Sequence, residues 1–149
     1  MTPPQITSSA LSLDFGDEVA GKLSDEQLVT LTNTGGGDLI IGDSEFIGAA
    51  PVDFGLTMDF CSFQVLAAGQ SCEVGFSMRA TEIGDRIAQF VIESNDPSQP
   101  LFFIDMSGKG TGSGGCRLSP GSPPMGSLIW LAMLLGLLLI YFRRRRNII

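Results

Sequence analysis

The chain has 149 residues and a formal net charge of −7, which allows one globular domain and a short additional segment. It contains no histidine, so serine triads and the commonest metal ligand are excluded. All sixteen acidic residues lie within residues 1–112, where only four residues are basic, whereas residues 113–149 carry five arginines and no acid. Because an acidic surface repels phosphate groups, we expect no nucleic-acid partner.

The first residues predict a linker followed by a strand. Residues 1–10 are rich in Pro, Ser and Thr and lack the basic and apolar regions of a secretory signal peptide. We expect the sequence to be the C-terminal part of a longer exported protein. A wrongly assigned start and insertion into the membrane through the C-terminal segment alone are the alternatives. Apolar and polar side chains then alternate over residues 11–15, which predicts a half-buried strand that ends at Gly16. The acidic residues 17–26 predict a loop.

Two strands are predicted on either side of a turn that contains three consecutive glycines. Residues 27–32 are rich in β-branched side chains and residues 39–41 are apolar, while residues 33–37 have the composition of a turn. After this pair, residues 42–55 predict an irregular segment. Four of its apolar side chains are expected in the core: Phe46, Ile47, Val52 and Phe54.

The clearest alternation falls on residues 72–78, where four side chains share one face: Cys72, Val74, Phe76 and Met78. We predict that this strand pairs with residues 61–66 through a turn at residues 67–70. Two further alternating segments follow, residues 88–92 and 102–106. Six or seven short strands, with no helical pattern before the C-terminal segment, predict an all-β fold, an antiparallel β-sandwich.

The C-terminal segment predicts a membrane-spanning helix at residues 126–142, which carry no charge. As a helix, residues 128–142 would span about 22 Å of a hydrocarbon layer of roughly 30 Å, and residues 125–127 nearly close that gap. Clustered arginines prefer the cytoplasm, so we expect residues 143–149 to form a cytoplasmic tail and the preceding domain to lie on the opposite side. The orienting residues are Arg143, Arg144, Arg145 and Arg146.

Two of the three cysteines, Cys61 and Cys72, flank a segment with turn chemistry. Outside the cytoplasm, this spacing predicts a disulfide that staples a hairpin and contributes about 2–3 kcal/mol in the chain-entropy picture. Two buried free thiols and a weak metal pair are the alternatives.

Five motifs, taken together, resemble those of a known family. In chain order they are LSLDFG, VTLTNTGGGDLIIG, AAGQSCEVGFSM, EIGDR and FVIESNDPSQPLFFIDMSGKGTG. They are similar to the immunoglobulin-like modules called choice-of-anchor D, relatives of the ASH (ASPM, SPD-2, Hydin) domain, over residues 11–112. The resemblance implies an immunoglobulin-like sandwich and names no activity, since modules of this family are found with different C-terminal anchors.

The resemblance assigns family roles to particular positions. The segment Arg79, Ala80 and Thr81 departs from the family's F-x-P-x pattern, which affects one loop. The positions that match are the N-T-G turn at Asn33, Thr34 and Gly35, the G-x-x-C at Gly69 and Cys72, the closing turn at Ser94, Asn95, Asp96 and Pro97, and the final glycines Gly108 and Gly110.

The C-terminal segment resembles bacterial sorting signals of the PEP-CTERM, GlyGly-CTERM and myxobacterial type, which combine a short motif, an apolar helix and a basic cluster. A linker rich in Gly, Ser and Pro, residues 113–125, contains the corresponding motif. A Pro-Glu-Pro is missing, so the resemblance implies a rhombosortase-like or myxosortase-like enzyme and not a standard exosortase. A permanent single-span anchor with an incidental cysteine is the alternative. The motif residues are Gly114, Gly115 and Cys116.

Other candidate sites carry weaker signals. The glycines of residues 108–112 lack the spacing of a phosphate loop, so we expect a flexible linker there. Glycoside hydrolysis by paired carboxylates needs a deep cleft that so small a sandwich seldom provides. We therefore expect no enzymatic activity, no cofactor and no metal site. Five acids could bind calcium but match no EF-hand spacing and are expected to be solvated: Asp14, Asp17, Glu18, Asp43 and Glu45.

These features predict a non-enzymatic structural module of a bacterial cell envelope. We expect a β-domain outside the cytoplasm, anchored in the membrane or sorted to the cell surface through the C-terminal segment. An extracellular binding or adhesion module is the alternative, with a glycan or protein recognised by sheet edges or by loops such as residues 42–55. The expected partners are the membrane, a sorting protease and a protein or glycan ligand.

Overall fold

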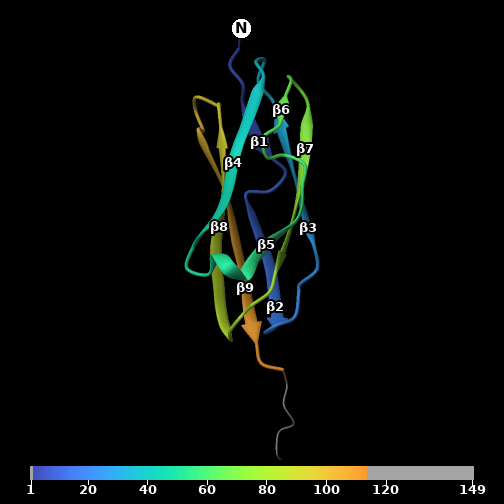
Figure 1. Ribbon diagram of the computed structural model, residues 1–149, viewed down its shortest axis with the longest axis vertical. Coiled ribbons are helices and arrows are strands. Elements are labelled where there is room, and N and C mark those ends of the chain that lie inside the picture. The colour runs from blue at the N-terminus through green and yellow to red at the C-terminus, as the bar shows by residue number, and fades with distance from the viewer. Residues whose placement is uncertain (1, 114–149) are drawn as a thin grey trace, which may run out of the picture. The chain divides into compact units, whose positions relative to one another are not determined.

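Two β-sheets face one another in the computed structural model, which describes residues 2–113 (Figure 1). One turn of 3₁₀ helix, η1 (Pro51–Asp53), lies between the fourth and fifth strands. The predicted all-β sandwich is confirmed. Within residues 2–113 its strands are β1 (Ile6–Ser8), β2 (Ser12–Val19), β3 (Gln27–Asn33), β4 (Leu39–Gly48), β5 (Phe54–Asp59), β6 (Val65–Leu66), β7 (Ser71–Met78), β8 (Gly84–Ser94) and β9 (Leu101–Thr111).

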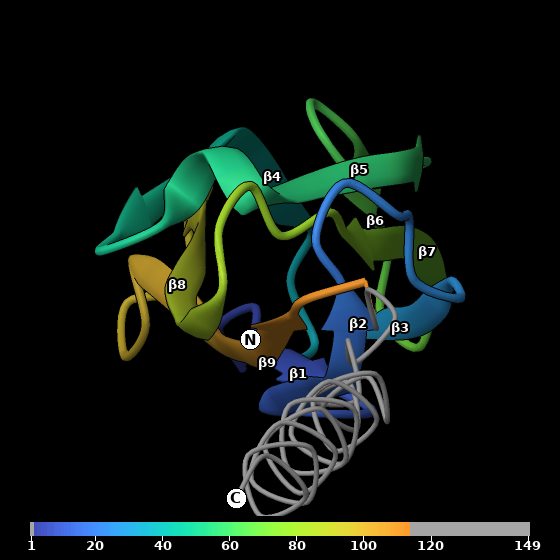
Figure 2. The ribbon, with the colours of Figure 1, turned by 90° about the horizontal axis from the view of Figure 1, so that it is seen from below.

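The strands form a four-stranded sheet in the order β1-β3-β7-β5 and a five-stranded sheet in the order β2-β9-β8-β4-β6. Figure 2 looks along the sandwich and shows β8 on the side opposite β7. Paired strands run antiparallel except β2 and β9, which are parallel. A purely antiparallel sandwich was therefore the wrong prediction at this pair, because the chain changes sheets over residues 9–11 and then lies alongside the last strand.

The inward faces of both sheets form one core, as the alternation predicted. All four predicted core residues of β7 are at most 9% exposed. At the centre, the ring of Phe90 lies 4.9 Å from that of Phe46 and 5.0 Å from that of Phe76. This contact fixes β4 and β8 against β7, so the alternate side chains of β4 and β8 face outward.

Residues 42–55 were expected to be irregular, but most of them belong to strands. β4 continues to Gly48, and β5 begins at Phe54. The register of β4 against β8 shifts between Ile41 and Ser44, and this β-bulge bends the strand without ending it.

Two of the four core side chains predicted in this segment are correct. Phe54 is buried and Phe46 packs against the core. Val52 is 82% exposed, because it lies on η1 at the end of the sandwich. Ile47 faces outward, because it alternates with the inward-facing Phe46.

Strand β7 pairs with β3 and β5, so the predicted hairpin between residues 61–66 and 72–78 is wrong. Val65 and Leu66 form β6 instead, which pairs with β4 in the other sheet. The segment between β5 and β6 therefore crosses from one sheet to the other, a connection that an alternating pattern cannot show.

Strand β2 continues past Gly16, where it was predicted to end, and reaches Val19. The register against β9 shifts between Asp14 and Asp17. Gly16 has a φ of 66°, a conformation that glycine adopts without steric cost. The glycine therefore marks a bulge within the strand and not its end.

Two buried polar side chains hold the predicted turns in place. Residues 1–10 were expected to be a linker, but they contain strand β1. The N–H of Ile6 in this strand donates to the Asp96 carboxylate at 3.0 Å. Asn33 donates to the carbonyl of Leu66 at 2.8 Å. Leaving such a buried group unpaired would cost about 1–3 kcal/mol. The two family turns therefore have a structural role.

Residues 108–112 were expected to be a flexible linker, but β9 extends to Thr111. A Cβ atom at Gly110 would overlap the carbonyl oxygen of Glu82 and would lie 2.9 Å from the Cβ of Ala80. The glycine thus permits a close approach between β9 and the loop before β8.

The predicted disulfide is confirmed, with the Cα atoms of Cys61 and Cys72 5.3 Å apart. The Asp59 carboxylate accepts the N–H of Cys61 at 2.8 Å, and the N–H and hydroxyl of Ser62 at 2.9 and 2.6 Å. Burial tends to raise the pKa of Asp59, but the hydrogen bonds to its charged form outweigh burial and hold the pKa below its ordinary value of 3.8.

The predictions for the C-terminal segment lie outside the described residues. They concern the linker at residues 113–125 beyond its first residue, the motif at residues 114–116, the membrane-spanning helix at residues 126–142 and the arginines at residues 143–146. Within residues 2–113, no helix has the length and apolar character needed to cross a membrane.

Replacing Gly110 by Ala should destabilise the domain by about 1–3 kcal/mol, because the added methyl group forces β9 away from the loop before β8. Gly112→Ala is the matched control, since its Cβ would lie at an ordinary 3.5 Å from Ile83. Urea denaturation of both variants measures the difference. Equal stability of the two variants would contradict the close approach.

Asp59→Asn should lower stability at pH 7 by less than about 1 kcal/mol, since the group is exposed and its interactions are screened. The folded-state pKa lies below the unfolded one, so this stabilisation is complete above pH 3.8 and is lost as the pH falls through the folded-state pKa. Urea denaturation at pH 7 and below pH 3.8 should show the difference shrinking. Asp25→Asn, at another exposed carboxyl, is the control. A pH-independent difference would contradict the assigned interaction.

Candidate functional site

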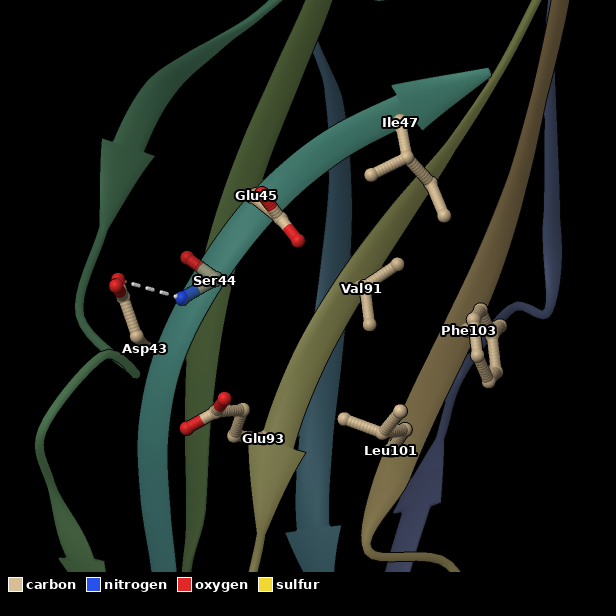
Figure 3. A pocket seen from close by; sticks show the side chains of 8 residues that line it. All are labelled: Asp43, Ser44, Glu45, Ile47, Val91, Glu93, Leu101 and Phe103. Carbon is tan, nitrogen blue, oxygen red and sulfur yellow. Dashed lines mark hydrogen bonds between the residues drawn. The ribbon is translucent and has the colours of Figure 1, made fainter.

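The outer face of the five-stranded sheet carries an open groove with a volume of about 420 Å³ (Figure 3). It lies on the side of β4, β8 and β9 that faces away from the core. Its lining residues are Asp43, Ser44, Glu45, Ile47, Val91, Glu93, Leu101 and Phe103.

The register of the three strands sets the pattern of side chains in the groove. Glu45 of β4 lies opposite Val91 of β8, which in turn lies opposite Phe103 of β9. One row thus crosses all three strands, from an acid to an aromatic ring. Glu93 and Leu101 form the neighbouring row. Because side chains alternate along each strand, both rows face outward.

Most of the acidic and apolar side chains lie on different sides of the groove. In Figure 3 the acids gather toward β4, whereas Leu101 and Phe103 lie on β9. Val91 lies between them on β8, and Ile47 is an apolar side chain on β4. Leu101 is 48% and Phe103 42% exposed, so the apolar side is open to solvent. The groove therefore offers apolar surface for burial next to negative charge, a combination suited to binding.

Among the described residues, no ion pair compensates the charge of the groove. No Lys or Arg is among its lining residues, and the Asp43 carboxylate accepts only its neighbouring Ser44 N–H, at 2.8 Å, among residues 2–113. The ion pairs within this range lie elsewhere: Lys22 with Glu18, and Arg86 with Asp53 and Glu82.

The groove provides carboxylate and hydroxyl groups but no arrangement that holds a metal. Across residues 2–113, no three His, Cys, Asp or Glu side chains are placed to hold a metal ion. The acids weighed for calcium are divided between two regions, Asp14, Asp17 and Glu18 on β2 and Asp43 and Glu45 on β4. The groove thus combines separate carboxylates with apolar side chains.

Only part of this groove was predictable from the sequence. Residues 42–55 are the predicted recognition segment, and they contribute its β4 side. The contributions of β8 and β9 were missed. A signal was present: Leu101 and Phe103 alternate with the core residues Phe102 and Ile104, so β9 begins apolar on both faces. An antiparallel strand with one solvated face ordinarily alternates with polar residues.

Several solved structures share this fold. The PapD-like (ASH) domain 7 of human CEP192 is 15% identical, with a TM-score of 0.54 and coverage of 74% of this chain and 88% of that domain. The Vibrio cholerae VesB protease is 21% identical, with a TM-score of 0.58 and coverage of 70% and 32%. The Escherichia coli chaperone DraB is 12% identical, with a TM-score of 0.51 and coverage of 75% and 58%. At these identities the likeness shows the fold alone.

The sequence itself identifies the family. No curated protein matches the chain. The chain spans about a third of the VesB structure, so the similarity concerns one domain of that protein. The family model described as HYDIN/CFA65/VesB-like, Ig-like domain matches residues 4–109, which confirms the predicted immunoglobulin-like, ASH-related module. The chain belongs to the HYDIN/CFA65/VesB-like family of immunoglobulin-like domains.

Proposed function

We propose that this chain is a non-enzymatic structural module of a bacterial cell envelope, with its β-domain outside the cytoplasm. The disulfide between Cys61 and Cys72 is the observation that carries the proposal. Disulfides persist in oxidising compartments and are rare in the cytosol. The acidic surface of the domain adds support, because it would keep the domain away from anionic lipid headgroups.

The C-terminal segment supplies the attachment in this proposal. A helix over residues 126–142 would enter the membrane, and the arginines at residues 143–146 would stay in the cytoplasm. The motif Gly114, Gly115 and Cys116 would be recognised by a rhombosortase-like or myxosortase-like enzyme. If it is not cut there, the same segment would remain as a permanent anchor.

Lysine labelling tests the orientation, because the two lysines of the chain, Lys22 and Lys109, both lie exposed in the β-domain. In intact cells of the native host, an amine reagent that cannot cross the cytoplasmic membrane should modify both. A cytoplasmic protein labelled only after lysis is the control. Labelling of both lysines only after lysis would overturn the proposal. The intact mass of the same material distinguishes processing near residue 115 from retention of the terminal arginines.

A binding or adhesion module is the second candidate function. The groove favours it, since Leu101 and Phe103 expose apolar surface beside uncompensated carboxylates. A purely structural spacer has no need of such a surface. The two functions are compatible, because an envelope module can carry a ligand on its outer sheet.

A further inference from the structure

We propose that the groove between β4, β8 and β9 binds an extended polypeptide segment in which basic side chains alternate with large apolar ones. This inference rests on the second function proposed above and names its ligand class. Three properties of the groove carry it: its uncompensated charge, the separation of its acidic and apolar sides, and the spacing of its side chains.

The charge of the groove selects a cationic partner. Asp43, Glu45 and Glu93 place three carboxylates along it without a Lys or Arg among the lining residues. The surrounding domain adds to this field, because residues 1–112 hold sixteen acids and four bases. A concave surface lined by one sign of charge raises the local concentration of oppositely charged ligands.

The arrangement of the carboxylates favours a chain over a single metal ion. In the part of the chain that the structure describes, no three metal-ligating side chains come together, so these acids do not converge on one point. Glu45 lies opposite Val91, two residues from Glu93, and such diagonal positions in a regular antiparallel ladder are roughly 7–8 Å apart. Alternate side chains of an extended peptide repeat about every 6–7 Å, which is close to the distance between the two glutamate positions. Two basic residues at positions i and i+2 can therefore face the two glutamates.

The apolar side has a matching repeat. Leu101 and Phe103 lie two residues apart on β9 and face outward together. In an extended peptide laid along the groove, the side chains at i+1 and i+3 point away from those at i and i+2. The basic residues would then face the acids toward β4, while the apolar residues cover Leu101 and Phe103 on β9 (Figure 3).

Other occupants fit the groove less well. A glycan would find one aromatic ring, Phe103, and a lining dominated by acceptors, with Ser44 as the side-chain hydroxyl donor. A second copy of this domain would bring the same acidic surface and would be repelled. A basic and apolar segment complements both sides at once.

The test uses the full chain in a mild nonionic detergent and a fluorescent eight-residue peptide with alternating Lys and Leu. Fluorescence anisotropy should show saturable binding, with empty micelles as the blank. Glu45→Gln combined with Glu93→Gln should weaken binding by about tenfold or more, because two charge pairs are lost. Raising the salt from about 0.05 to about 0.5 M should weaken it several-fold, since these pairs are exposed and screened.

Glu73→Gln is the matched control, an exposed glutamate on β7 of the other sheet, and should leave the affinity unchanged. Leu101→Ser should lower the affinity for the Lys-Leu peptide. It should have little effect on the affinity for a Lys-Ser peptide, which should already be low. The glutamine substitutions conserve shape at exposed positions, so the folded fraction, checked by thermal denaturation, should match that of the original chain.

Three outcomes would overturn the inference. They are the absence of saturation up to about 1 mM peptide, equal affinity for a Glu-Leu peptide, and equal affinity of the Glu45→Gln, Glu93→Gln double variant. Saturable binding of a neutral oligosaccharide that competes with the peptide and ignores both substitutions would assign the groove to a glycan instead. Lysine labelling in cells reports only the compartment of the β-domain, whereas the peptide assay reports only binding by the groove. Failure of one proposal can therefore be distinguished from failure of the other.

Discussion

The disulfide between Cys61 and Cys72 fixes one of the two places within residues 2–113 where the chain crosses directly from an edge strand of one sheet to an edge strand of the other. β5 lies at the edge of one sheet and β6 at the edge of the other. Between them, the N–H of Phe60 donates to the carbonyl of Glu73 at 3.0 Å, and the carbonyl of Gln64 accepts the N–H of Ile41 at 2.9 Å. The covalent bond to β7 holds this crossing, which leads into β6, the strand that pairs with β4 beside the groove.

The family motifs of this chain are explained by the fold and leave its outer face free. Asn33 and Asp96 are buried polar side chains that join turns to neighbouring strands. Gly110 allows β9 to pass close to the loop before β8. None of these residues lines the groove. The residues of the groove can therefore change without loss of the residues that maintain the fold.

Local sequence patterns predicted the positions of the strands better than the pairing between strands. The alternation in β7, β8 and β9 located the core residues correctly, because side-chain direction is a property of a single strand. The pairing of residues 61–66 with β7 was wrong, since pairing depends on the sheet crossing that no local pattern encodes. The glycines were also ambiguous: Gly16 marks a bulge and Gly110 a close contact, while both were interpreted as ends of ordered structure. The groove needed three strands from distant parts of the sequence, so only its β4 side was anticipated.

The redox state of the two cysteines in the native host tests the central claim most directly. Native protein is trapped in acid, denatured and treated with a thiol-alkylating reagent before and after reduction, and the peptides containing Cys61 and Cys72 are measured by mass spectrometry. An oxidising compartment predicts that both cysteines resist alkylation until a reductant is added. Complete alkylation of both without reductant would mean that the domain resides in a reducing compartment, and the envelope account would be contradicted.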